Sequence, residues 1–197
     1  MSKLKLNKPT IDDLKNRINN FQKMDDLTYD KSYVYFLKYF ENKNILTEED
    51  LIISANFTYG WMPTILNFKS NKFNECVDIL NVSKTKNRLE YEEIKTLKTL
   101  VNNSLVGTSK LLHFINPDKY AIWDSRVCKF LSNVTHKYFI EQIDIYFSYL
   151  DICKELTQKQ DYDFIHQRYI QCVGHDATKM KSIEQLMFLS SEEPLKN

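Results

Sequence analysis

The residues that could do chemistry are concentrated between Leu105 and Val127. Gly107 is one of only three glycines in the chain, so we expect a backbone requirement for glycine at this position. The pattern predicts a helix that ends in a tight turn at Gly107 and a second helix capped by Thr108 or Ser109. Free N–H groups at the start of that helix, together with Lys110, would suit a phosphate. A plain connection between two helices is the alternative, since caps and glycines occur at most helix ends.

A carboxylate follows this predicted turn. After a stop at Pro117, the chain reaches Asp124 at the expected start of a further helix. A carboxylate beside a sugar can stabilise oxocarbenium-like charge or activate a water molecule. Asp is also a preferred N-cap, and one oxygen can cap a helix while the other faces a ligand. A nucleobase that is excised there must leave the base stack and enter an aromatic pocket. The candidate walls of this pocket are Tyr59, Trp61, Tyr120 and Trp123, and the alternative is that these rings belong to the hydrophobic core.

This segment resembles the helix-hairpin-helix DNA glycosylases, the superfamily of endonuclease III, MutY and the oxoguanine glycosylases. In that family a helix, a glycine-containing hairpin and a second helix grip the DNA backbone, and a short connection leads to a catalytic Asp. The resemblance places Gly107 at a hairpin glycine and Asp124, within Ile122–Val127 (IWDSRV), at the catalytic carboxylate. Lys110 lies within one residue of the Schiff-base lysine of the bifunctional members.

The resemblance implies DNA contacts as well as chemistry. It implies an all-helical DNA-binding protein of base-excision repair, and a monofunctional hydrolase of the N-glycosidic bond if the chain is an enzyme. The hairpin departs from the usual L-P-G-[VI]-G, and aligning it on the glycine puts Ser109 at the Schiff-base position. The implied residues are Asp124 and Lys110 for catalysis, Gly107, Thr108, Ser109, Lys110 and Arg126 for DNA, and Tyr59, Trp61 and Trp123 for the base pocket.

The composition is that of a globular protein. Among 197 residues there are 27 Lys and Arg against 26 Asp and Glu, and 43% are hydrophobic, which argues against disorder and low-complexity classes. No apolar run is long enough for a transmembrane helix, and the N-terminus lacks the apolar core of a signal peptide. Four scattered cysteines suit a reduced, cytoplasmic chain. Neither GxGxxG nor GxxxxGK[ST] occurs, which removes the standard nucleotide-binding loops.

The apolar periodicity is helical along nearly the whole chain. The pattern predicts one all-α domain over residues 1–197 with nine or ten helices, and it allows two lobes, 1–82 and 88–190. Capping boxes are expected at Thr10–Asp13 and Thr47–Asp50. A long helix from Thr135 should bury the seam Phe139, Ile143, Tyr146, Leu150 and Cys153. Further helices are predicted over about 11–24, 30–42, 48–60, 63–68, 71–81, 88–101, 109–116, 161–173 and 177–189, and one from Asp124. A break is expected at Asn102–Asn103–Ser104, directly after the helix over 88–101.

Other clusters of polar residues give weaker indications of a functional site. Cys172 and His175 have a metal-like spacing without a second pair, so we predict neither a metal nor a cofactor. The stretch 84–88 (KTKNR) is basic, and its contact with nucleic acid would require it to share a face with other cations near Asp124. The alternative function is a non-enzymatic helical interaction module of a bacterial stress or defence system. The cations expected to share that face are Lys84, Lys86, Arg88, Lys110, Lys119, Arg126 and Lys129.

Overall fold

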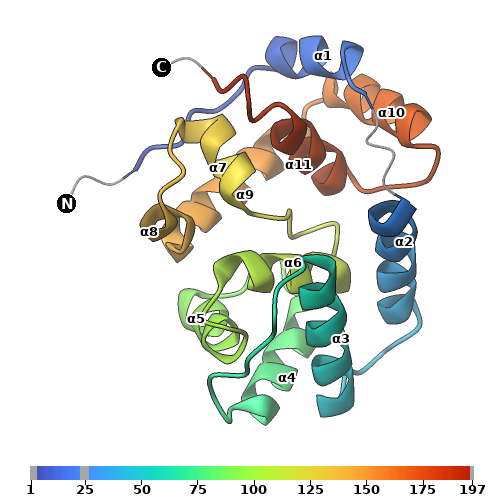
Figure 1. Cartoon of the computed structure of the whole chain (residues 1–197). Helices are drawn as coiled ribbons and strands as arrows, with labels where there is room; N and C mark the ends of the chain where they lie inside the picture. Colours follow the sequence, from blue (N-terminus) through green and yellow to red (C-terminus); the bar gives the residue numbers. More distant parts are fainter. Residues whose placement is uncertain (1–3, 23–26, 196–197) are drawn as a thin grey trace. The chain divides into compact units, whose positions relative to one another are not determined.

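The computed structural model describes residues 4–22 and 27–195, and its regular elements over those ranges are all helices (Figure 1). The prediction of an all-α fold is confirmed, with eleven helices in the described ranges instead of nine or ten. None of these helices is long and apolar enough to cross a membrane. The helices are α1 (Ile11–Asn19), α2 (Leu27–Glu41), α3 (Glu48–Trp61), α4 (Phe73–Ser83), α5 (Tyr91–Leu100), α6 (Leu105–Ile115), α7 (Ser125–Ser132), α8 (Lys137–Ile140), α9 (Ile143–Thr157), α10 (Tyr162–Val173) and α11 (Lys179–Leu189).

The chain forms two compact units. Residues 25–119, with α2 to α6, make up the inserted unit, and residues 1–24 with 120–197 make up the terminal unit, which holds α1 and α7 to α11. These units group the residues differently from the lobes 1–82 and 88–190. The single domain over residues 1–197 stays a prediction.

Helix α6 is the central helix of the inserted unit. It packs against α2, α3, α4 and α5. Its sequence, LVGTSKLLHFI, is apolar on nearly every side, and nine of its eleven residues are buried. A helix that is hydrophobic all round is stable only when others cover it, so α6 sets the core of this unit.

Helix α11 has the same position in the terminal unit, where it packs against α1, α7, α9 and α10. It buries Ile183, Leu186 and Met187. It also buries an ion pair, with Lys181 Nζ 2.7 Å from Glu184 Oε2. The two charges satisfy each other within one helix, which limits the cost of removing them from water.

Both predicted capping boxes are present, and the second extends beyond its own helix. Thr47 and Asp50 exchange side-chain and backbone hydrogen bonds at the start of α3. The same carboxylate accepts a hydrogen bond from Tyr39 Oη at 2.8 Å and lies 2.6 Å from Lys43 Nζ. Burial by itself raises the pKa of the Asp50 carboxyl, but the hydrogen bonds from Lys43 and the Thr47 backbone outweigh it and the pKa falls to about 2. Asp50 therefore ties α2 to α3.

We expect Asp50→Asn to lower the free energy of unfolding by about 2 kcal/mol at pH 7, since each pKa unit is worth about 1.4 kcal/mol. The folded-state pKa lies below the ordinary value of 3.8, so the contribution is complete above pH 5 and is lost as the pH falls toward 2. Urea unfolding of wild type and variant at several pH values measures this difference. The exposed carboxylate of Asp78 in the same unit gives the control, Asp78→Asn, and an equal loss in both variants would contradict the prediction.

Several predicted helices differ from the structure. The helix expected over about 11–24 ends at Asn19, and residues 23–24 of that prediction lie outside the described residues. The helix expected over 63–68 is wrong: α3 ends at Trp61, and the following segment is extended up to an isolated antiparallel bridge between Phe68 and Val101. Pro63 lacks the N–H that would continue a helix. The long helix from Thr135 is instead two helices, α8 and α9, separated at residues 141–142. The α9 part of its seam is buried as predicted.

Candidate nucleic-acid interface

Helices α5 and α6 pack against each other and form a helical hairpin. Its turn is made by Asn102 and Asn103, which both adopt left-handed backbone conformations, with φ of 56° and 52°. Ser104 is the N-cap of α6 and accepts a hydrogen bond from the Gly107 N–H at 3.2 Å. The predicted tight turn at Gly107, with a cap at Thr108 or Ser109, is therefore wrong. Asn tolerates the left-handed region almost as well as glycine, so the Asn pair makes the turn.

Gly107 is needed for packing instead of for its backbone angles. A Cβ at this position would lie 2.3 Å from Tyr59 Oη and 2.7 Å from Tyr59 Cζ. The Tyr59 hydroxyl donates a hydrogen bond to the Val101 carbonyl at 2.8 Å. The ring from α3 thus passes close over α6 and holds the last residue before the Asn turn. Glycine at this point lets α3 fix the shape of the hairpin.

The hydroxyls of Thr108 and Ser109 point into the inserted unit. Both residues are fully buried. Thr108 Oγ1 donates to the Ser104 carbonyl at 2.8 Å, and Ser109 Oγ donates to the Val106 carbonyl at 2.9 Å. The exposed residue of the hairpin turn is Asn103. Contact with DNA by the Thr108 and Ser109 side chains stays a prediction, and it would require this helix to move.

Lys110 lies beside an aromatic cluster. Its ammonium is 5.2 Å from the centre of the Trp61 ring, a cation–π contact between α6 and α3. The cluster continues through Tyr33 and Phe114 to His113, which is fully buried. The Tyr33 hydroxyl and His113 Nε2 are 2.9 Å apart. Lys110 is therefore a partly buried cation held against a ring.

The segment that leads to Asp124 is anchored inside the terminal unit. Tyr120, Ala121, Ile122 and Trp123 are all buried. The Tyr149 hydroxyl donates to the Ile122 carbonyl at 2.9 Å, and the Trp123 indole N–H donates to the Ile140 carbonyl at 2.8 Å. Burial raises the pKa of Tyr149 well above its ordinary value, so its hydroxyl stays a donor. These anchors fix the start of α7.

Asp124 is the N-cap of α7. Its Oδ1 accepts hydrogen bonds from the backbone N–H groups of Arg126 at 2.9 Å and Val127 at 3.0 Å. Its Oδ2 has no hydrogen-bond partner in the described ranges, and the residue is partly exposed. The Arg126 guanidinium lies 4.6 Å from the centre of the Phe188 ring. The predicted cap is confirmed, and one carboxylate oxygen remains available.

The pocket walls that the resemblance implies, Tyr59, Trp61 and Trp123, have different environments. Tyr59 and Trp123 are core residues, 2% and 0% exposed, in the inserted and terminal units respectively. Trp61 is partly exposed. Their common role as a base pocket stays a prediction, because Tyr59 and Trp123 belong to units that are each described separately. Cys128, one turn into α7, is also buried, and burial raises the pKa of its thiol.

Several predicted cations already bind groups of this chain. Lys86 forms an ion pair with Glu93 at 3.0 Å, and Lys129 forms one with Glu192 at 3.0 Å. Lys84 Nζ donates to a backbone carbonyl at 3.3 Å. The five cations up to Lys119 lie in the inserted unit, whereas Arg126 and Lys129 lie in the terminal unit. Their gathering on one face beside Asp124 stays a prediction.

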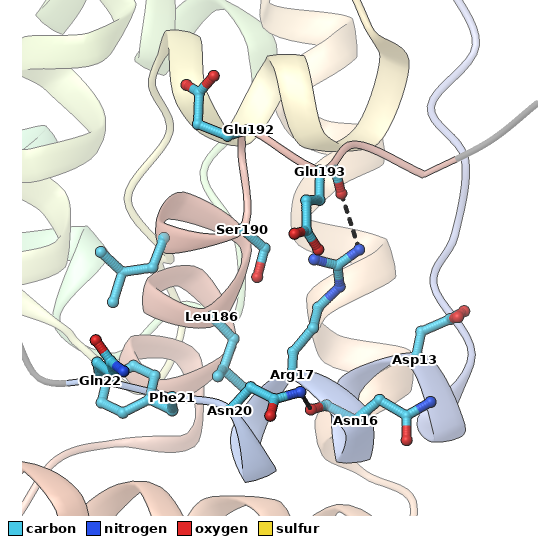
Figure 2. A pocket seen from close by; sticks show the side chains of 11 residues that line it. Asp13, Asn16, Arg17, Asn20, Phe21, Gln22, Leu186, Ser190, Glu192 and Glu193 are labelled. Carbon is cyan, nitrogen blue, oxygen red and sulfur yellow. Dashed lines mark hydrogen bonds between the residues drawn. The ribbon is translucent and has the colours of Figure 1, made fainter.

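A shallow groove of about 520 Å³ lies in the terminal unit, along α1 and the C-terminal end of α11 (Figure 2). Figure 2 shows Arg17 reaching across it to donate to the Glu193 carbonyl, at 2.9 Å. The same guanidinium lies over the Phe130 ring. None of the predicted site residues lines this groove. In the described ranges, no group of three or more His, Cys, Asp or Glu residues is arranged to hold a metal.

No protein-family model, no curated protein and no solved structure matches the chain. The sequence reasoning located the Asp124 cap correctly. It also predicted the break at Asn102–Asn103–Ser104, where the structure has the turn, but it began the next helix at residue 109 and so missed the Ser104 cap. It also missed the contact between Lys110 and Trp61, which lie 49 positions apart and so leave no local signal.

Proposed function

We propose that this chain binds nucleic acid in the manner of the helix-hairpin-helix DNA glycosylases, with Asp124 as its reactive carboxylate. The observation that carries the proposal is that the two carboxylate oxygens of Asp124 have different environments. One oxygen caps α7, and the other has no partner in the described ranges. A carboxylate held in this way can face a sugar without destabilising its helix.

The α5–α6 hairpin supports the binding part of the proposal. Its turn exposes Asn103, a residue whose side chain and backbone can contact phosphate oxygens. Lys110, one helical turn beyond the Gly107 position, adds a positive charge that is only partly buried. The turn is rigid, because Asn102 donates to the Ile65 carbonyl at 2.8 Å and pairs with the Asn67 backbone. A rigid turn beside a cation suits a backbone contact that does not read sequence.

A gel-shift assay of binding to duplex DNA at several salt concentrations tests this proposal. Phosphate contacts release counterions, so we expect the affinity to fall at least about tenfold between 50 and 200 mM salt. Asn103→Asp places a negative charge on the turn and keeps a residue that tolerates the left-handed conformation. We expect it to weaken binding about tenfold through repulsion of the phosphates.

Asn42→Asp is the matched control, since Asn42 is an exposed asparagine of the same unit that directly follows α2. Its neighbour Lys43 contacts the start of α3, whereas the hairpin contacts the end of α3 through Tyr59. The control variant makes the same change of charge away from the hairpin and should leave the affinity within about twofold. Equal weakening by both variants would show a nonspecific charge effect. Absence of binding at low salt would reject the proposal and favour the helical interaction module.

A further inference from the structure

Two buried polar groups on one side of α3 have no hydrogen-bond partner in the part of the chain that the structure describes. They are Thr58 Oγ1 and Trp61 Nε1. Residues three apart on a helix are neighbours, with about 5–6 Å between their Cβ atoms. A buried polar group without a partner costs roughly 1–3 kcal/mol, and native proteins satisfy such groups with water or a ligand. This side of α3 therefore presents two buried polar groups that no described residue satisfies.

The side chains around Trp61 reach the protein surface. Tyr29 contacts the ring edge-on, with 5.3 Å between ring centres, and is 39% exposed. Phe114 contacts it in the same manner from α6, also at 5.3 Å. The Lys110 ammonium lies over one face of the Trp61 ring, 5.2 Å from the ring centre, and Lys110 is partly exposed. Tyr29 and Lys110 are thus the exposed members of this cluster, whereas Phe114 belongs to the core.

The chemistry of these groups selects the ligand. An indole N–H and an ammonium group can only donate hydrogen bonds, and the Thr58 hydroxyl can donate as well. Three donors with one positive charge fit an acceptor that carries negative charge. The surrounding aromatic rings lower the local dielectric, which strengthens a charge-assisted hydrogen bond. We propose that Trp61, Lys110 and Thr58 form a binding site for an anionic phosphate oxygen.

The site assigns Trp61 a role other than base stacking. Tyr29, Tyr33, Phe114 and Lys110 already contact its ring, so the N–H is the group left for a ligand. The phosphate can come from a nucleic-acid backbone, in which case the site rests on the proposed function, or from a free phosphate. The chemistry recognised at the oxygen is the same in both cases.

The two tryptophan indole N–H resonances in a ¹H–¹⁵N spectrum test the site in the full chain. Trp123 is an internal reference, because its N–H is buried and bonded to the Ile140 carbonyl. Trp61→Phe identifies the Trp61 signal by its loss. On titration with inorganic phosphate at constant ionic strength, we expect the Trp61 signal to shift saturably and the Trp123 signal to stay in place. Chloride at the same ionic strength should leave both unchanged.

Lys110→Gln should raise the apparent Kd for phosphate at least tenfold, since hydrogen bonds to charged groups contribute about 1.5–3 kcal/mol. Lys69→Gln, which removes an exposed lysine of the same unit, should change it less than twofold. An unmoved Trp61 signal, or an equal shift with chloride, would overturn the site and leave water as the partner of both groups.

Duplex DNA then distinguishes the two sources of phosphate. A shift with DNA as well as with inorganic phosphate identifies a backbone contact. A shift with phosphate but not with DNA identifies a free phosphate, and the proposed function then loses this support while the site stands. DNA binding in the gel without a Trp61 shift would overturn the site as a DNA contact and leave the proposed function intact.

Discussion

Gly107→Ala should destabilise the protein by about 1–3 kcal/mol, the usual cost of forcing an extra methyl group into a packed core. The added Cβ would lie 2.3 Å from Tyr59 Oη and 2.9 Å from Tyr59 Cε2. The ring cannot withdraw freely, because its hydroxyl is bonded to the Val101 carbonyl beside the hairpin turn. Thermal unfolding should show a fall in Tm of about 2–4 °C for each kcal/mol.

The sign of the effect is diagnostic, because Gly→Ala in a helix normally stabilises by roughly 0.4–1 kcal/mol. Gly60 in α3 is the matched control, since a Cβ there meets nothing within 4 Å. We expect Gly60→Ala to raise the free energy of unfolding and Gly107→Ala to lower it. Tyr59→Phe should partly rescue Gly107→Ala, because it removes the closest atom. Stabilisation by Gly107→Ala would show that α6 does not need this close approach.

The proposed function predicts that Asp124→Asn abolishes base excision while DNA binding and folding remain. Loss of a positioned acid or base usually costs 10²–10⁴-fold in rate, and Asn has no carboxylate charge. Asn is as good an N-cap as Asp, so α7 should start at the same residue. Release of abasic product from duplexes that carry single damaged bases measures the chemistry, and the gel assay measures binding.

Asp124→Ala separates the two roles of this residue. It removes the cap as well as the carboxylate, and we expect it to lower the free energy of unfolding by about 1 kcal/mol relative to Asp124→Asn. Activity equal to wild type in Asp124→Asn would reduce Asp124 to a helix cap. If the wild-type protein releases no product from any damaged duplex, the enzymatic part of the proposal fails and only DNA binding remains to be tested.

The helices were largely predictable because their signals are local. Capping boxes at Thr10 and Thr47 lie within four residues, and both are present. The buried seam of α9 follows from the spacing of its apolar residues. The break at residues 141–142 was not predicted, since the apolar pattern continues through it and only the caps differ.

The candidate site was predicted only where the role of a residue follows from its neighbours in the sequence. Asp124 as the cap of α7 is such a case. Gly107 illustrates the opposite, because its requirement comes from Tyr59, which is 48 residues away in the sequence. Glycine is expected at turns from its backbone freedom, and the sequence cannot show that a distant ring occupies the space of its missing side chain. The contact between Lys110 and Trp61 is hidden for the same reason.

The terminal unit combines α1 with helices that follow the inserted unit in the chain, and this predicts an order of folding. Helix α1 packs against α10 and α11, which emerge from the ribosome after more than 140 further residues. All five helices of the inserted unit are complete before either partner of α1 exists. Because units fold as they are made, we expect residues 25–119 to reach their native state first on the nascent chain. Leu14 and Ile18, the apolar face of α1, would meanwhile be exposed to chaperones.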